Sequence, residues 1–203
     1  MPQVEEREGL GGVHDRGGWG SGGGGGDSEL PGAFPLPTAK LGVWILLGVA
    51  TVIFSALVSA YLVRMGLPDW KSSPKPGLLW LNTAVLALSS LSFQRALRAA
   101  RRAEAPTVRA GIRLGGVLGM LFIAGQLRAW GQLQSLGLGV SSNPSSSFFY
   151  LITALHGLHL LGGLVAWAVV SRRPTPLRIE LCALYWHFLL AVWGVLYGLL
   201  LLT

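Results

Sequence analysis

Five long apolar runs follow one another along this chain of 203 residues, and they constrain its fold more than any other feature. Each is long enough, at 1.5 Å per residue, to cross a hydrocarbon core about 30 Å thick. Backbone N–H and C=O groups find no water in that core, so segments that cross it form helices. The sequence therefore predicts an all-α integral membrane bundle of five helices, at about residues 41–63, 78–97, 114–136, 148–170 and 179–202.

The composition agrees with a lipid environment. Hydrophobic residues make up 51% of the chain and charged residues only 12%, whereas about a quarter of a soluble domain is charged. The net charge of +7 comes from 16 Lys+Arg against 9 Asp+Glu, and it is placed in the gaps between the apolar runs. This placement is typical of membrane topology signals and argues against a nucleic-acid partner.

The basic residues also indicate how the helices are oriented. Lys40 precedes the first run, and the gaps after the second and fourth runs are rich in arginine: Arg95, Arg98, Arg101, Arg102, Arg109, Arg113, Arg172, Arg173 and Arg178. The opposite side holds only Arg64, Lys71 and Lys75. Because cytoplasmic loops are enriched in Lys and Arg, we expect a cytoplasmic N-terminus and an external C-terminus.

The first 39 residues differ in character from the rest. The stretch GGWGSGGGGGDSELPG is rich in glycine and has no apolar period. Such composition predicts a solvated, disordered Gly/Pro-rich tail on the cytoplasmic side, either a plain tail or a tether for a partner. The expected division is therefore a tail at residues 1–39 and a five-helix membrane domain at residues 40–203.

Two of the predicted helices carry stripes of small or polar side chains. In the first helix the stripe is Gly48, Thr51, Ser55 and Ser59, and in the second it is Asn82, Thr83, Ser89 and Ser90. Residues seven apart share a helix face. In lipid such stripes usually join helices through close approach and hydrogen bonds, so we expect packing rather than a ligand pathway.

Three histidines and one carboxylate lie on the last two predicted helices. His156 and His159 are three residues apart and share a face, as do Glu180 and His187, which are seven apart. This set could bind a metal or a haem. The alternative is that neutral imidazoles bond between helices while Glu180 pairs with a loop arginine. No carboxylate at depth is available to orient the rings, which favours the structural interpretation.

The remaining polar residues point to no catalytic chemistry. Gln126 and Arg128 lie near the outer end of the third helix, where an arginine can reach the headgroups. Cys182 is the only cysteine, so no internal disulfide or paired-thiolate site can form in the chain. The sequence has no phosphate-binding glycine loop, no HExxH and no serine elbow. We therefore predict no catalytic residue and no metal ligand in this chain.

Taken together, these segments resemble the cytochrome c oxidase subunit III family, in its short five-helix bacterial form. The resemblance covers about residues 40–203. Its most specific parts are FFYLITALHGLHLLGG in the fourth helix and ELCALYWHF in the fifth. LLWLNTAVLALSS in the second helix is similar too, with weaker matches in KLGVWILLGVATVIFSALVSAY and FIAGQLRAW.

The resemblance implies a non-catalytic accessory subunit of a proton-pumping haem–copper oxidase in the bacterial cytoplasmic membrane. In the family, subunit III packs against subunit I, supports turnover and proton uptake and holds phospholipids. Haem and copper lie in subunits I and II, and electrons come from cytochrome c or, in related oxidases, from quinol. Residues that carry over, as structural or as lipid- or subunit-contacting positions, are Asn82, Gln126, His156, His159, Glu180, Trp186 and His187.

Three positions depart from the family pattern. Family members often have a carboxylate where this chain has Ala50, Ala129 and Leu190. These differences argue against a proton-collecting role that depends on buried carboxylates, and they leave the packing role intact. The stripes of the first two helices, including Ser55 and Ser59, suit a face against subunit I. The rival functions are a haem-binding membrane electron carrier that uses the three histidines, and a small transporter, which the few ionisable groups at depth disfavour.

Overall fold

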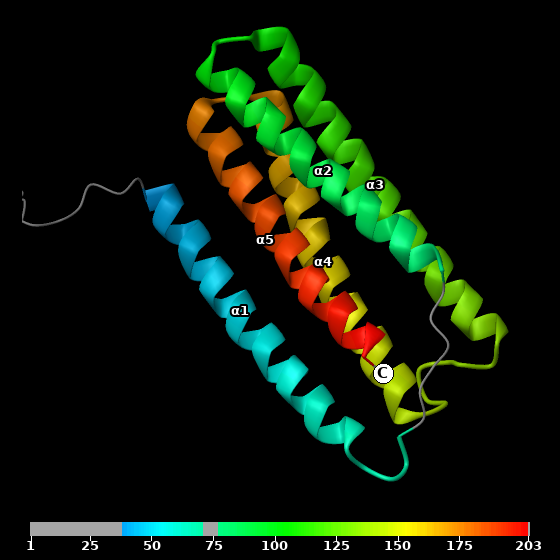
Figure 1. Ribbon diagram of the computed structural model, residues 1–203. Coiled ribbons are helices and arrows are strands. Elements are labelled where there is room, and N and C mark those ends of the chain that lie inside the picture. Colours follow the sequence, from blue (N-terminus) through cyan, green and yellow to red (C-terminus); the bar gives the residue numbers. More distant parts are fainter. Residues whose placement is uncertain (1–37, 71–76, 203) are drawn as a thin grey trace, which may run out of the picture. The chain divides into compact units, whose positions relative to one another are not determined.

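The computed structural model of the chain describes residues 38–70 and 77–202, which form five α-helices (Figure 1). They are α1 (Thr38–Met65), α2 (Leu78–Arg101), α3 (Ala105–Ser135), α4 (Pro144–Arg172) and α5 (Pro176–Leu201). The predicted all-α fold and its five helices are confirmed. The tail predicted for residues 1–39 lies outside the described residues, apart from Thr38 and Ala39, which begin α1.

Turn and capping residues set the starts of α3 and α4 earlier than the apolar runs predict. α3 begins at Ala105 rather than near residue 114, two residues after Ala103, whose φ of +56° closes the turn from α2. α4 begins at Pro144, because Asn143 Oδ1 accepts a hydrogen bond of 2.8 Å from Ser146 N and so caps the helix. The added first turns of α3 and α4 are polar, so they did not appear as part of the apolar runs.

Four of the helices, α1, α3, α4 and α5, are long and apolar enough to cross a membrane. Large apolar side chains lie exposed along all five helices, a surface that lipid solvates better than water does. The chain is a membrane protein. α2 is less apolar than the other four, because polar side chains interrupt it, among them Asn82, Ser89, Ser90 and Gln94.

The helices pack in a definite order within the described part of the chain. α2 and α3 form a closely packed hairpin, α5 lies against both α2 and α4, and α4 also packs on α3. α1 contacts only α4 and α5, along one side of the bundle (Figure 1). Its buried residues are four, Leu47, Ala50, Phe54 and Tyr61, whereas α5 buries eleven. Most of the surface of α1 is thus open to lipid or to a partner.

Buried glycines bring α3 close to its neighbours. A Cβ atom at Gly115 would lie 2.6 Å from the ring of Phe93 on α2, and one at Gly116 would lie 2.0 Å from the indole of Trp167 on α4. These separations are far below van der Waals contact, so only glycine fits there. Small residues at helix contacts are a usual means of close packing in membranes.

Candidate functional site

The polar stripe of α2 faces the inside of the bundle. Ser89 is fully buried, its Oγ donates to Gly115 O on α3 at 2.7 Å, and it accepts a bond of 2.6 Å from Trp186 Nε1 on α5. Thr83 Oγ1 likewise accepts a bond of 3.0 Å from Trp193 Nε1. The stripe therefore joins α2 to α3 and α5. These contacts lie within the chain, so the stripe of α2 is turned away from the surface where a partner subunit was expected to meet it.

His187 adds a second connection between α5 and α2. Its Nε2 lies 2.9 Å from Gln94 Oε1, and its Nδ1 is hydrogen-bonded to Ser90 Oγ. An amide oxygen only accepts, so the network assigns the proton to Nε2, and Nδ1 then accepts from the hydroxyl. Both ring nitrogens are occupied in this way. His187 is therefore held in place between α5 and α2 as a structural group.

His156 lies at the centre of the bundle with no exposed surface. Its ring is 5.9 Å from that of Phe122 and 5.2 Å from that of Trp193 between centroids, and neither ring nitrogen has a hydrogen-bond partner among the described residues. His159, one turn further along α4, has Nδ1 2.9 Å from Leu155 O. Aromatic rings rather than polar groups thus surround His156.

The histidines do not converge on a metal site. His159 and His187 each have partners of their own, and Glu180 lies at the N-terminal end of α5. Among residues 38–70 and 77–202, no group of three or more His, Cys, Asp or Glu side chains is arranged to hold a metal ion. Cys182 is a buried free thiol among apolar neighbours.

Two ion pairs occur near helix ends in the described ranges. Glu180 Oε1 lies 3.0 Å from Lys40 Nζ at the start of α1, so its partner is this lysine and not the loop arginine that the sequence predicted. The prediction was wrong because the two residues are 140 positions apart and are brought together only by the docking of α1 on α5. At the other end of α1, the Arg64 guanidinium hydrogen-bonds to Asp69 and holds the pKa of that carboxyl below its ordinary value.

Ala50, Ala129 and Leu190, the departures from the family pattern that the resemblance indicated, are enclosed to different degrees. Ala50 on α1 and Ala129 on α3 are buried, with 1% and 0% of their surface exposed, whereas Leu190 on α5 is partly buried. Short apolar side chains at Ala50 and Ala129 therefore fill positions inside the bundle. A carboxylate in either place would need a partner or a proton to be tolerated.

The stripe of α1 differs from that of α2, because it is exposed. Ser55 and Ser59 both lie on the surface and line a groove of about 400 Å³ between α1 and α5. Phe188 and Val195 supply part of the opposite wall. This is the one predicted stripe whose small side chains remain available for contact with another helix.

The sequence indicated Trp186 but missed three other tryptophans that donate hydrogen bonds between helices. The four bonds run from Trp130 to Thr153, Trp167 to Ile112 O, Trp186 to Ser89 and Trp193 to Thr83. A buried indole N–H needs an acceptor, so the combination of tryptophans with hydroxyl side chains on other helices was the available signal. Of the predicted residues, Trp186 belongs to this network, whereas Asn82 connects α2 to α3 separately, with its Nδ2 3.4 Å from Gln126 Oε1.

Comparison with known proteins agrees with this architecture. A family model described as cytochrome c oxidase subunit III matches residues 72–202. This chain belongs to the cytochrome c oxidase subunit III family. It is 32% identical over 172 residues to cytochrome c oxidase subunit 3 of Synechocystis sp., an alignment that covers 77% of this chain and 72% of the relative.

Two further relatives match over a similar length. The probable cytochrome c oxidase subunit 3 of Nocardia farcinica is 30% identical over 167 residues, covering 76% of this chain and 82% of the relative. Cytochrome c oxidase subunit 3 of Thermostichus vulcanus is 27% identical over 175 residues, covering 79% and 85%. The resemblance found in the sequence is therefore confirmed, and this subunit III family member belongs with an oxidoreductase complex of the membrane.

Proposed function

We propose that this chain is the non-catalytic accessory third subunit of a proton-pumping haem–copper oxidase. Membership of the subunit III family carries the proposal. The geometry of His159 and His187 supports it, because each ring is bonded to protein groups that hold it in place. Haem and copper would then lie in partner subunits I and II, which take electrons from cytochrome c or, in a quinol oxidase, from quinol.

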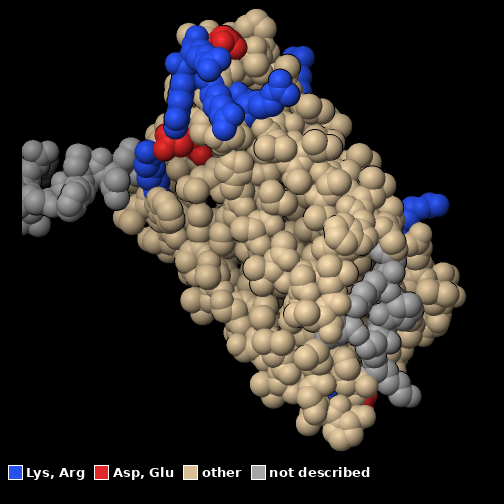
Figure 2. Space-filling model, viewed as in Figure 1, with Lys and Arg blue, Asp and Glu red and all other residues tan. Residues whose placement is uncertain are grey.

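The proposed location is the bacterial cytoplasmic membrane, with all five helices crossing it and the N-terminus of α1 in the cytoplasm. Lysine and arginine side chains gather at the end of the bundle that holds the α2–α3 turn (Figure 2). Positive residues favour the cytoplasmic side. α2 can cross in spite of its polar side chains, because Ser89 and Ser90 are buried and bonded within the chain.

The surface proposed for contact with subunit I is the exposed face of α1 that borders its groove with α5. Its small side chains at Gly48, Thr51, Ser55 and Ser59 are exposed, and such ridges permit close approach of another helix. The polar stripe of α2 faces the inside of the bundle and so is not part of this proposed surface. The remaining exposed apolar surface is available to phospholipids. Since alanine occupies positions 50 and 129, support of turnover and proton uptake would come from packing rather than from carboxylates of this chain.

Copurification of subunits I and II with the tagged full-length chain tests the proposal. The Ser59→Phe variant should lose most of the copurified subunits while still inserting in the membrane, because a bulky ring prevents close approach at the ridge. Val165→Phe is the matched control, since Val165 is 67% exposed on α4, away from that ridge. This control should retain both subunits.

The results of this experiment distinguish the proposed accessory function from the proposed α1 interface. If the wild-type chain brings down no oxidase subunits, or shows a stoichiometric haem spectrum when purified alone, the accessory function is refuted. If the wild type copurifies and Ser59→Phe does so equally, the function stands and the α1 interface is wrong.

A further inference from the structure

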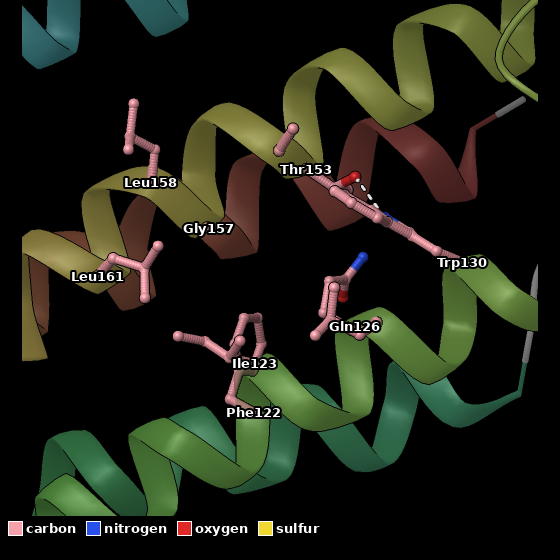
Figure 3. Close-up of a pocket in the computed structure, with 10 residues that line it drawn as sticks. Phe122, Ile123, Gln126, Trp130, Thr153, Gly157, Leu158 and Leu161 are labelled. Carbon is pink, nitrogen blue, oxygen red and sulfur yellow. Dashed lines mark hydrogen bonds between the residues drawn. The ribbon is translucent and has the colours of Figure 1, made fainter.

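A pocket between α3 and α4 has no part in the role proposed above. Its volume is about 230 Å³, and Phe122, Gln126, Trp130, Thr153 and Gly157 contribute to its walls (Figure 3). Leu127 and Leu158 form part of its lining and are 57% and 62% exposed, so the pocket opens sideways towards the surrounding hydrocarbon. A dry cavity of about 150 Å³ already holds benzene, so there is room for an aromatic molecule.

The pocket wall carries one buried polar atom without a partner, the Nε2 of Gln126. Gln126 is 5% exposed, and its Oε1 accepts from Asn82 Nδ2 at 3.4 Å on the side of α2. With the oxygen held there, the amide nitrogen points into the space between α3 and α4 (Figure 3). A buried N–H without an acceptor is costly, so this donor is a strong signal for a bound acceptor.

The other polar groups of the wall are already bonded to each other. Trp130 Nε1 donates to Thr153 Oγ1 at 3.0 Å, and Thr153 Oγ1 donates to Phe149 O at 2.6 Å. The site therefore offers one donor in an apolar surrounding. A water molecule does not suit it, because a buried water needs two to four polar partners.

The depth of the pocket restricts the source of the acceptor. In the structure Gln126 lies nine residues before the end of α3, deeper than the sequence indicated, and both α3 and α4 are long and apolar enough to cross a membrane. The ester groups of phospholipids lie at the edges of a hydrocarbon core about 30 Å thick, roughly 15 Å from its middle. The acceptor must then belong to a molecule that dissolves wholly in the hydrocarbon.

We propose that this pocket binds a planar, lipid-soluble carbonyl compound whose oxygen accepts a hydrogen bond from Gln126 Nε2. The partly exposed ring of Trp130, one helical turn from Gln126, provides an apolar surface for a planar body (Figure 3). Aromatic side chains favour stacked or edge contacts with such rings. The site is independent of the contact with subunit I.

Photolabelling with benzophenone tests the site, because this probe is itself an aromatic carbonyl compound that inserts into nearby C–H bonds under light. The full-length chain in lipid nanodiscs should be labelled preferentially on residues 122–130 and 153–161. Fluorenone should compete with this labelling, whereas fluorene, which has the same shape without the carbonyl, should not. Gln126→Leu should lower the labelling of these segments about tenfold, because the only hydrogen bond to the probe is lost.

A second variant keeps Gln126 and its bond to Asn82 intact. A Cβ atom at Gly157 meets nothing within 4 Å, so Gly157→Leu can fill the pocket without disturbing the helix. It should also abolish the preferential labelling. The matched control is Gly194→Leu on α5, where a Cβ likewise meets nothing, and it should label as the wild type does.

Three results would overturn the proposal. Equal competition by fluorene would show that the pocket takes any apolar occupant, such as an acyl chain. Undiminished labelling of the Gly157→Leu variant would show that the probe binds elsewhere. Loss of labelling when the chain is copurified with subunits I and II would show that a partner helix covers the pocket.

Discussion

Replacing Gly116 with alanine tests the close contact of α3 with α4. The added Cβ would lie 2.0 Å from Trp167 Cε2, whereas carbon atoms in contact settle about 3.5–4.0 Å apart. The indole is not free to move away, because its Nε1 donates a bond of 2.8 Å to Ile112 O. Overpacking costs about 1–3 kcal/mol and a strained hydrogen bond about 1 kcal/mol, while alanine regains about 1 kcal/mol of helix propensity. We expect a net loss of about 1–3 kcal/mol in the free energy of unfolding.

Reversible unfolding in mixed micelles, followed by circular dichroism during titration with a denaturing detergent, measures this loss. Gly131→Ala is the matched control on the same helix, because a Cβ atom there meets nothing within 4 Å. It should be neutral or more stable than the wild type by up to about 1 kcal/mol. If Gly116→Ala is as stable as Gly131→Ala, the contact with Trp167 does not limit the approach of the two helices, and the reasoning fails.

Three further predictions concern hydrogen bonds and one ion pair. Ser89→Ala leaves the buried Trp186 Nε1 without an acceptor and should cost about 1–3 kcal/mol in the same unfolding assay; an unchanged midpoint would contradict this. His187→Phe removes both of its bonds to α2 and should cost a similar amount, and a stability equal to the wild type would show that the network is dispensable. Arg64 lowers the pKa of Asp69 in the folded chain, so the pair stabilises the fold above the ordinary pKa and this contribution is lost as the pH falls through the lowered value. Asp69→Asn should therefore differ from the wild type in stability at neutral pH, and the difference should disappear once the pH has fallen below the lowered pKa of Asp69; a pH-independent difference would refute the ion-pair account.

The positions of the helices could be predicted from the sequence, because the hydrocarbon core demands long apolar runs whatever their neighbours are. The ends of the helices could not be predicted in the same way. The first turns of α3 and α4 depend on a turn residue and on a cap, Ala103 and Asn143, which contribute nothing to apolarity. The family followed from local motifs, above all HGLH and YWHF, which occur intact on α4 and α5.

The partners of the polar side chains were harder to predict. Periodicity showed that Asn82 and Ser89 share a face of α2, but it does not say which helix that face meets. The stripe of α1 has the same kind of sequence and lies on the surface instead. The packing of α1 on α5 also determined the partner of Glu180. The packing around α3 left the Nε2 of Gln126 without a hydrogen-bond partner. Such pairings depend on three-dimensional packing, which spacing along one helix does not contain.

The inward polar face of α2 has a consequence for the way the chain enters the bilayer. Insertion machinery weighs each segment by its apolarity as it emerges, and α2 is synthesised before its acceptors and donors on α3 and α5 exist. Alone, it would expose serine and amide groups to hydrocarbon. The segment should therefore leave the translocon together with α3 as a hairpin, held by the glycine contacts between the two, and a chain cut after Arg101 should insert poorly.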